Sequence, residues 1–139
     1  MYRELILREA AGNRFVKPQA GADPEAIRNA EHLLGCTFPR ELKDMLLEMN
    51  GDNWRLYSVS DILERNREIR RLLGEEREGL DSLLFFAGNG CGGYYCYELL
   101  PGGRAKPGEI FLWSRGNSAW RPAAGSIAEL ITRYYRDGK

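Results

Sequence analysis

Residues 23–51 read DPEAIRNAEHLLGCTFPRELKDMLLEMNG, and this stretch predicts two consecutive amphipathic helices. The first begins at Asp23, whose side chain can accept a hydrogen bond from a free backbone N–H, and Pro24 suits the first helical position. Its apolar residues recur on one face: Ile27, Ala30 and Leu34. Gly35 follows the last of them and ends the helix. The face predicts a helix that packs against a core.

The second helix of this stretch has the clearest apolar spacing in the chain. It begins after Phe38-Pro39, because proline is tolerated in the first turn of a helix but not in its interior. The apolar residues fall at i, i+3, i+4 and i+7, which are Leu42, Met45, Leu46 and Met49. Asn50-Gly51 then predicts a left-handed C-cap.

Shorter sequence patterns predict the helices and strands on either side of these two helices. Residues 2–10 predict a short amphipathic helix at the N-terminus. Residues 54–59 predict a short strand. Ser60-Asp61 then predicts the cap of an arginine-rich helix that extends to Leu73, and a charged loop follows.

The second half of the chain is dominated by strand signals. The apolar residues 83–87 predict a buried strand, and the glycine-rich residues 88–93 predict a wide hairpin turn. The aromatic residues 94–99 and the apolar residues 110–113 predict two more strands. Residues 114–125 are predicted to form an irregular loop.

The last predicted element is a helix that begins with the capping box Ser126-Ile-Ala-Glu129. Its apolar stripe consists of Ile127, Leu130, Ile131 and Tyr134. Helices come first, then strands joined by turns too short for crossover helices, then one helix. This order predicts an α+β fold with a mainly antiparallel central sheet, against which the N-terminal helices and the C-terminal helix pack.

Composition and charge predict one globular domain over residues 1–139. The chain carries 20 Lys+Arg and 20 Asp+Glu, so its overall field predicts neither a nucleic acid nor a membrane as a partner. Charges lie inside the only apolar stretch of the N-terminus, which argues against a signal peptide. Three cysteines, Cys36, Cys91 and Cys96, cannot all pair with one another. We therefore expect reduced thiols and a cytoplasmic protein.

Three chemical patterns occur in the sequence, and none of them predicts an enzyme. Residues 88–93 contain G-x-G-x-x-G, but they precede an aromatic strand rather than the helix that would hold a pyrophosphate, so we expect no cofactor. His32, Cys36, Cys91 and Cys96 could supply four zinc ligands, but their spacing is poor and we expect no metal. Nucleophilic catalysis by Cys91 or Cys96 would need activation by His32, the only histidine.

Tryptophan and arginine in the loop over residues 114–125 indicate a protein interface, because these residue types dominate the energetic centres of interfaces. The candidate partner-binding residues there are Arg115, Asn117, Trp120 and Arg121. Trp120 is either an exposed anchor or a plug that seals the end of the sheet. Asp52, in the loop after Asn50, and Asn89, in the glycine-rich turn, are the other candidates.

The helix pair resembles the N-terminal signature of the SUKH superfamily. The residues that carry the resemblance are Asp23, Pro24, Glu25, Ile27, Glu31, Leu34, Gly35, Phe38, Pro39, Glu41, Leu42, Met45, Leu46, Met49, Asn50 and Gly51. Residues 86–97, FAGNGCGGYYCY, are similar to the glycine-rich turn and central hairpin of the family, and residues 126–131, SIAELI, to its usual closing helix. The resemblance covers about residues 20–134.

This resemblance implies an α+β domain that binds another protein. The superfamily includes cytosolic bacterial immunity proteins, which neutralise a cognate toxin by binding it, and fungal cell-wall assembly regulators. Many of the cognate toxins are nucleases. We therefore expect an immunity protein that is a monomer or a weak homodimer. The alternatives are a regulatory scaffold for a cellular protein or peptide, and a ligand-binding or hydrolytic protein that uses the glycine-rich turn with Cys91 and Cys96.

Overall fold

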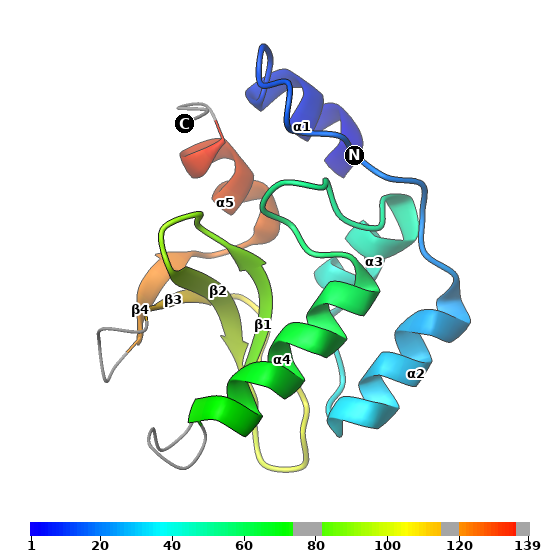
Figure 1. Cartoon of the computed structure of the whole chain (residues 1–139), viewed down its shortest axis with the longest axis vertical. Helices are drawn as coiled ribbons and strands as arrows, with labels where there is room; N and C mark the ends of the chain where they lie inside the picture. Colours follow the sequence, from blue (N-terminus) through cyan, green and yellow to red (C-terminus); the bar gives the residue numbers. More distant parts are fainter. Residues whose placement is uncertain (74–81, 115–119, 136–139) are drawn as a thin grey trace.

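The computed structural model describes residues 1–73, 82–114 and 120–135, and it confirms the α+β class. The elements are α1 (Tyr2–Glu9), α2 (Pro24–Leu34), α3 (Arg40–Glu48), α4 (Val59–Leu73), β1 (Leu83–Gly88), β2 (Gly93–Glu98), β3 (Ile110–Ser114), β4 (Trp120–Ala124) and α5 (Ile127–Tyr134). The four strands form one antiparallel sheet in the order β1-β2-β3-β4. Helices precede and follow the sheet in the chain and pack against it (Figure 1). None of the helices in the described ranges is long and apolar enough to cross a membrane.

The two helices predicted from residues 23–51 are confirmed, although the second ends differently. Asp23 Oδ1 accepts the Glu25 N–H at 2.9 Å, and Gly35 ends α2 with φ of 67°. The left-handed C-cap predicted for α3 at Asn50-Gly51 is wrong, because α3 ends at Glu48 and the next residue is extended. The positive φ of Gly51, 83°, belongs instead to the turn that follows, where a Cβ would lie 2.8 Å from the backbone nitrogen of Ser58.

The strand predicted over residues 54–59 is also wrong. In this segment Leu56 forms one isolated antiparallel bridge with Ala87 of β1. Ser58 and Asp61, not Ser60, cap α4: Ser58 Oγ accepts the Asp61 N–H at 3.2 Å, and the Asp61 carboxylate accepts the Ser58 N–H at 3.4 Å. The helix therefore begins earlier than the sequence signal indicated, and the segment before it remains a loop.

The predicted irregular loop over residues 114–125 contains a strand, β4, at the edge of the sheet. Leu112 pairs with Arg121 and Trp113 pairs with Trp120. Pro122 lacks an N–H and weakens the strand signal, but an edge strand tolerates proline because one of its sides has no partner strand. Tertiary pairing with β3 therefore outweighs the low strand propensity of this segment.

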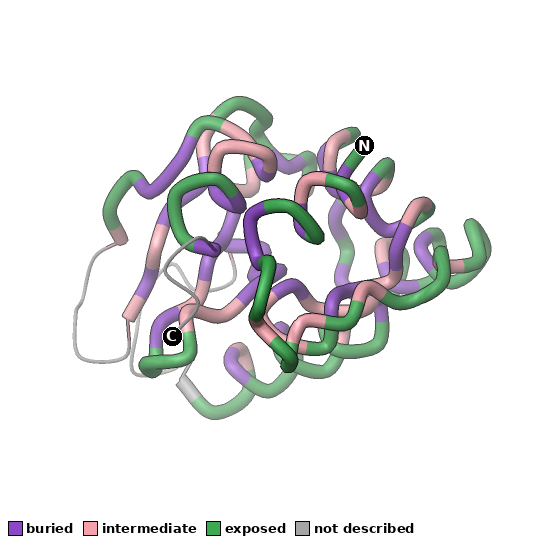
Figure 2. The backbone as a smooth tube through the Cα atoms, turned by 90° about the horizontal axis from the view of Figure 1, so that it is seen from above, coloured by how far each residue is buried: buried purple, intermediate pink, exposed green. Residues whose placement is uncertain are grey.

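The sheet buries apolar side chains on both of its faces. Along the backbone, buried residues lie mostly in the inner segments and exposed residues mostly on the outer turns (Figure 2). One face meets the main helical core, and its side chains are Leu84, Phe86, Tyr95, Tyr97 and Ile110. The opposite face holds a second cluster, formed by Leu83, Phe85, Cys96, Phe111 and Trp113 with Ile69 of α4. Trp113 was expected to face the core, and it is buried. Adjacent residues of a strand therefore belong to different faces, as alternation requires.

The C-terminal helix is confirmed, with one change to its buried stripe. Ser126 Oγ accepts the Glu129 N–H at 3.1 Å, so Ser126 caps the helix as the sequence indicated, and Ile127, Leu130 and Ile131 are buried. Tyr134 was expected in the stripe, but its side chain is on the surface, 37% exposed. The buried tyrosine is Tyr135, which lies just past the end of α5.

Glu41 of α3 joins the sheet to the start of α5. One carboxylate oxygen accepts the hydroxyl of Tyr97 at 2.7 Å, and the other accepts the Ile127 N–H at 2.9 Å. Ile127 is the first residue of α5, whose unpaired N–H groups favour an acid. Glu41 therefore fixes where α5 starts on the helical face of the sheet.

The outer edge of β1 is closed by side-chain and loop contacts. Asn66 of α4 is fully buried, and its carboxamide bonds both backbone groups of Phe85: Nδ2 donates to the carbonyl at 2.8 Å, and Oδ1 accepts the N–H at 2.9 Å. Further along, the Tyr57 N–H donates to the Phe86 carbonyl at 3.1 Å. These bonds satisfy an edge that another chain could otherwise pair with.

Asn66→Ala is expected to lower the free energy of unfolding by about 2–4 kcal/mol, because it leaves a buried N–H and a buried carbonyl of β1 without partners. Urea unfolding followed by circular dichroism measures this loss. Asn29→Ala on the exposed face of α2 is the matched control, with an expected change within about 0.5 kcal/mol. Equal stability of the two variants would contradict the role given to Asn66.

Candidate functional site

Two of the predicted partner-binding residues, Asn89 and Arg121, line one hollow at the end of the sheet. Its volume is about 610 Å³. The lining residues are Arg55, Asn89, Cys91, Tyr95, Leu112, Arg121, Pro122, Ala123 and Tyr134. They come from the loop before α4, the glycine-rich turn, β2, β3, β4 and α5, and the turn between β1 and β2 lies beside α5 at this end of the molecule (Figure 1). Arg115 and Asn117 lie outside the described residues.

The floor of the hollow is a row of side chains across three strands. Tyr95 of β2 pairs with Leu112 of β3, and Leu112 pairs with Arg121 of β4. Residues directly opposite each other in an antiparallel sheet project from the same face, so the three side chains lie side by side. The row places an aromatic hydroxyl and a guanidinium at opposite ends, with an apolar residue between them.

Tyr95 has a buried ring and a hydroxyl that is influenced by both arginines of the hollow. Its ring centroid lies 5.7 Å from that of Tyr134. Burial raises the pKa of Tyr95, and Tyr134 adds to that effect, while the positive charges of Arg55 and Arg121 act in the opposite direction. The hydroxyl is therefore protonated at neutral pH and can donate a hydrogen bond. Tyr95 was not predicted as a site residue, because its relation to Arg121 depends on the unrecognised strand β4.

The glycine-rich turn forms one wall of the hollow and is shaped by Asn89. The Asn89 Oδ1 accepts the N–H groups of Cys91 at 2.8 Å and Gly93 at 2.9 Å. Gly90 and Gly92 adopt positive φ of 78° and 82°, as the turn requires. Asn89 therefore holds the turn, and the oxygen of its side chain is engaged within it. The turn leads into β2, as the sequence predicted, and not into a helix.

Asp52 lies in the interior and has no exposed surface, so it cannot contact a partner as the sequence suggested. Its Oδ1 accepts the backbone N–H groups of Trp54, Arg55 and Leu56 at 3.0, 2.9 and 3.0 Å. Its Oδ2 accepts the hydroxyl of Tyr135. Burial raises the pKa of Asp52, although these four hydrogen bonds act in the opposite direction. The role of Asp52 is to hold the loop before α4 against the end of α5.

This placement of Asp52 positions two lining residues of the hollow. Arg55 receives its backbone position from the bond to Asp52, and Tyr134 precedes Tyr135 in the chain. The Arg55 guanidinium lies over the Trp54 ring, 4.2 Å from its centroid, and reaches toward the turn, where a Cβ on Gly90 would lie 3.8 Å from it. Arg55 is therefore a lining residue that sequence reasoning missed, and no motif around it indicated the contact.

Trp120 lies on the opposite face of the sheet from Arg121, since the two are consecutive residues of β4. Its side chain is half-buried against the second cluster. The indole Nε1 donates to the Glu98 carboxylate at 3.0 Å. The structure therefore separates Trp120 from the hollow, and its placement matches the plug at the end of the sheet more closely than the exposed anchor.

The cysteines are free thiols in different surroundings. Cys91 is exposed in the turn, whereas Cys36 and Cys96 are buried. Burial raises the pKa of Cys36 to about 11 and also raises that of Cys96. Because the thiolate is the reactive form, the two buried cysteines are poor nucleophiles at neutral pH. Among the described residues, no three His, Cys, Asp or Glu come close enough together to hold a metal ion.

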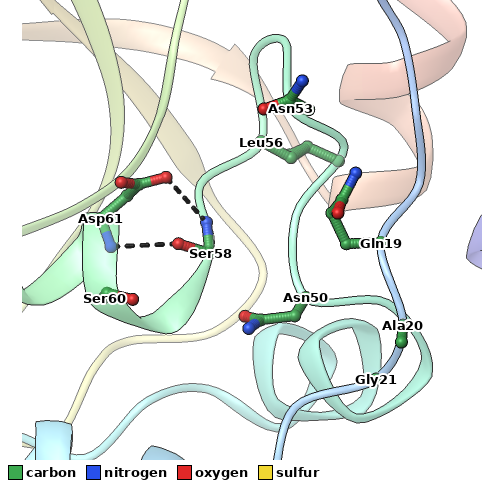
Figure 3. Close-up of a pocket in the computed structure, with 9 residues that line it drawn as sticks. All are labelled: Gln19, Ala20, Gly21, Asn50, Asn53, Leu56, Ser58, Ser60 and Asp61. Carbon is green, nitrogen blue, oxygen red and sulfur yellow. Dashed lines mark hydrogen bonds between the residues drawn. The ribbon is translucent and has the colours of Figure 1, made fainter.

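A second hollow, of about 510 Å³, lies at the start of α4 (Figure 3). Its lining residues are Gln19, Ala20, Gly21, Asn50, Asn53, Leu56, Ser58, Ser60 and Asp61. Several of its polar groups are engaged in holding the chain: Ser58 and Asp61 cap the helix, and Asn50 Oδ1 accepts the Val59 N–H at 2.8 Å. The hollow at the end of the sheet, with two arginines, the buried Tyr95 in its floor and the exposed Tyr134, is therefore the candidate functional site.

Comparison with known proteins identifies a family. The model described as SMI1 / KNR4 family (SUKH-1) matches residues 21–133, which include every element from α2 to β4 and nearly all of α5. No curated protein matches the chain. The matched range contains the whole floor of the hollow.

Asp52→Asn is expected to change how stability depends on pH. Because folding raises the pKa of Asp52 above its ordinary value of 3.8, its contribution to stability is complete below that value and is lost as the pH rises through the folded-state pKa. The free energy of unfolding of the wild-type protein, minus that of Asp52→Asn, should therefore fall as the pH rises above the ordinary pKa of 3.8. Urea unfolding at a series of pH values measures the difference. A difference that grows with pH would show that the hydrogen bonds outweigh burial.

Proposed function

Because the chain belongs to the SMI1 / KNR4 family (SUKH-1), we propose that it acts by binding another protein. In its specific form, the proposal is that the chain is a cytoplasmic immunity protein, monomeric or weakly dimeric, that neutralises a cognate bacterial toxin by direct binding. Family membership supports a binding role in immunity or regulation. The more specific claim, that the partner is a toxin, rests on the resemblance of the sequence to the SUKH superfamily.

The observation that carries the proposal is the composition of the hollow at the end of the sheet. It presents Arg55, Arg121, Tyr95 and Tyr134 in a concave surface of about 610 Å³. Arginine and tyrosine are enriched among the residues that dominate binding energy, and such residues are most effective where a partner excludes water from them. The hollow thus offers a partner protein both a cavity and the side chains that make strong contacts.

The chemistry of the hollow supports binding more than catalysis. Its nucleophile would be Cys91, which needs a neighbouring base. The only histidine of the chain, His32, is exposed on α2 and does not line the hollow. Burial raises the pKa of Tyr95 above its ordinary value of 10.0, so its hydroxyl is a poor base at neutral pH. These residues suit a surface that donates hydrogen bonds and positive charge to a bound partner.

The regulatory alternative has one observation in its favour, which is the balance of charge. With 20 basic and 20 acidic residues, the chain has no long-range attraction for a strongly basic nuclease. A scaffold for a cellular protein or peptide would use the same hollow. The two functions differ in the identity of the partner and not in the binding surface.

Co-expression with the protein encoded next to this chain is expected to rescue growth if that neighbour is toxic, and the two proteins should copurify. Arg121→Ala should weaken the complex by about tenfold or more, measured by isothermal titration calorimetry, because the variant removes a central guanidinium. Arg40→Ala, which removes a guanidinium that is 94% exposed on α3, is the control and should bind as tightly as wild type.

If co-expression gives no rescue of growth and the two proteins form no complex, the immunity proposal is wrong. A complex with a non-toxic cellular protein, weakened by Arg121→Ala in the same way, would instead support the regulatory alternative. If Arg121→Ala and Arg40→Ala lose affinity for the partner equally, the hollow is not the binding surface.

A further inference from the structure

We infer that the hollow at the end of the sheet accepts a tyrosine side chain from the partner protein. The inference rests on the proposed function and adds the chemistry of what enters the site. In this arrangement the incoming ring packs on the apolar floor of the hollow, and its hydroxyl oxygen accepts a hydrogen bond from Tyr95.

The first step is the unused hydroxyl of Tyr95. Tyr95 and Tyr97 project from the same face of β2, because alternate residues of a strand share a face. The Tyr97 hydroxyl donates to Glu41 at 2.7 Å, whereas the Tyr95 hydroxyl has no hydrogen bond to any described residue. Tyr95 is nevertheless only 4% exposed. A buried tyrosine usually has a hydrogen-bond partner, so this hydroxyl is available for a group from another molecule.

The second step is the direction in which this hydroxyl can be reached. Tyr95 lines the hollow, and its hydroxyl oxygen retains accessible surface, unlike the polar side-chain atoms of the described residues that are sealed from solvent. A tyrosine hydroxyl has one proton to donate and lone pairs to accept a further bond. A polar atom that enters the hollow can therefore bond to Tyr95.

The third step is the apolar lining around the hydroxyl. Leu112 lies directly opposite Tyr95 in the sheet, and Pro122 and Ala123 of β4 also line the hollow. The Tyr134 ring lies 5.7 Å from the Tyr95 ring, at an angle of 37°. A planar ring packs well against aromatic and aliphatic surfaces and loses little side-chain entropy in doing so. The lining therefore favours an aromatic side chain over a flexible polar one.

The fourth step is the choice of tyrosine among the aromatic side chains. Phenylalanine has no polar atom to bond to the Tyr95 hydroxyl. The indole of tryptophan is a donor only, so the Tyr95 proton would still have no acceptor. Tyrosine supplies both the ring and the acceptor. Arg121 of the lining is exposed and in no ion pair with a described residue, and a guanidinium of this kind can stack on the incoming ring.

The edge strand β4 favours the insertion of a side chain over the addition of a strand. A partner can extend a sheet by pairing with its edge strand. Here Pro122 has no N–H, and the Ala123 carbonyl already accepts the Arg133 guanidinium at 2.8 Å. A side chain that enters the hollow needs neither of these backbone groups.

The test uses the full chain labelled with nitrogen-15 and needs no natural partner. In nuclear magnetic resonance titrations, acetyl-Tyr-amide at millimolar concentration is expected to shift the amides of residues 91–95, Arg121 and Ala123. It should bind about threefold or more tightly than acetyl-Phe-amide, because only the phenol can bond to the Tyr95 hydroxyl. Acetyl-Leu-amide and acetyl-Glu-amide should bind more weakly than either.

Tyr95→Phe keeps the ring and removes the hydroxyl, so it should bind acetyl-Tyr-amide and acetyl-Phe-amide equally. Its urea unfolding should match that of wild type, because no hydrogen bond to a described residue is lost. Tyr94→Phe is the matched control: Tyr94 packs on the opposite face of the sheet, so the preference for acetyl-Tyr-amide should remain.

Three results would overturn the inference. The first is equal binding of acetyl-Tyr-amide and acetyl-Phe-amide to wild type, or no shift with either. The second is a preference for acetyl-Tyr-amide that survives in Tyr95→Phe. The third is tighter binding of acetyl-Glu-amide than of acetyl-Tyr-amide, which would assign the hollow to an acidic side chain instead.

With a partner identified, the complex separates this inference from the proposed function. Tyr95→Phe should weaken the complex by about threefold or more, and the change of one partner tyrosine to phenylalanine should do the same. The two changes together should weaken it no more than either alone, because both remove the same hydrogen bond. Additive losses, in a complex that still forms, would overturn the tyrosine inference and leave the protein-binding function standing.

Discussion

The buried carboxylate of Asp52 is the interaction on which the geometry of the hollow depends. Burial of an acid is costly, and here four hydrogen bonds offset part of that cost: three from the loop that follows Asp52 and one from Tyr135. The same bonds join two segments separated by more than half of the chain. Arg55 lies in the first segment and Tyr134 in the second, so one interior acid helps to place two lining residues of the hollow.

Most of the fold could be predicted from the sequence where a local interaction fixes an element. The caps of α2 and α5 use side chains that bond their own helix, and both were found. The errors fall in segments whose structure is determined by contacts with residues far away in the sequence. The segment over residues 54–59 is a loop because Asp52, bonded in the interior by Tyr135 from far along the chain, accepts three of its N–H groups. Strand β4 forms because β3 pairs with it in spite of Pro122. Neither cause is visible in a local pattern.

The site was less predictable than the fold, because it is built from residues far apart in the chain. Composition indicated Arg121 and Asn89, and the structure brings both to one hollow. Trp120 was grouped with Arg121 as part of the same loop, but a strand sends consecutive side chains to opposite faces. Tyr95 and Arg55 could be recognised only after the register of the sheet and the path of the loop before α4 were known.

The hollow is lined by contributions from six segments, and its charged residues lie outside both buried clusters. The two arginines of the lining are therefore separate from the side chains that form the core, whereas Tyr95 and Ala123 belong to both the lining and the main core. Exchanging one exposed lining side chain alters recognition without opening a cavity in the core or removing a cap. A scaffold of this kind can change partners in small evolutionary steps, keeping its stability while toxin and inhibitor, or regulator and target, diverge together.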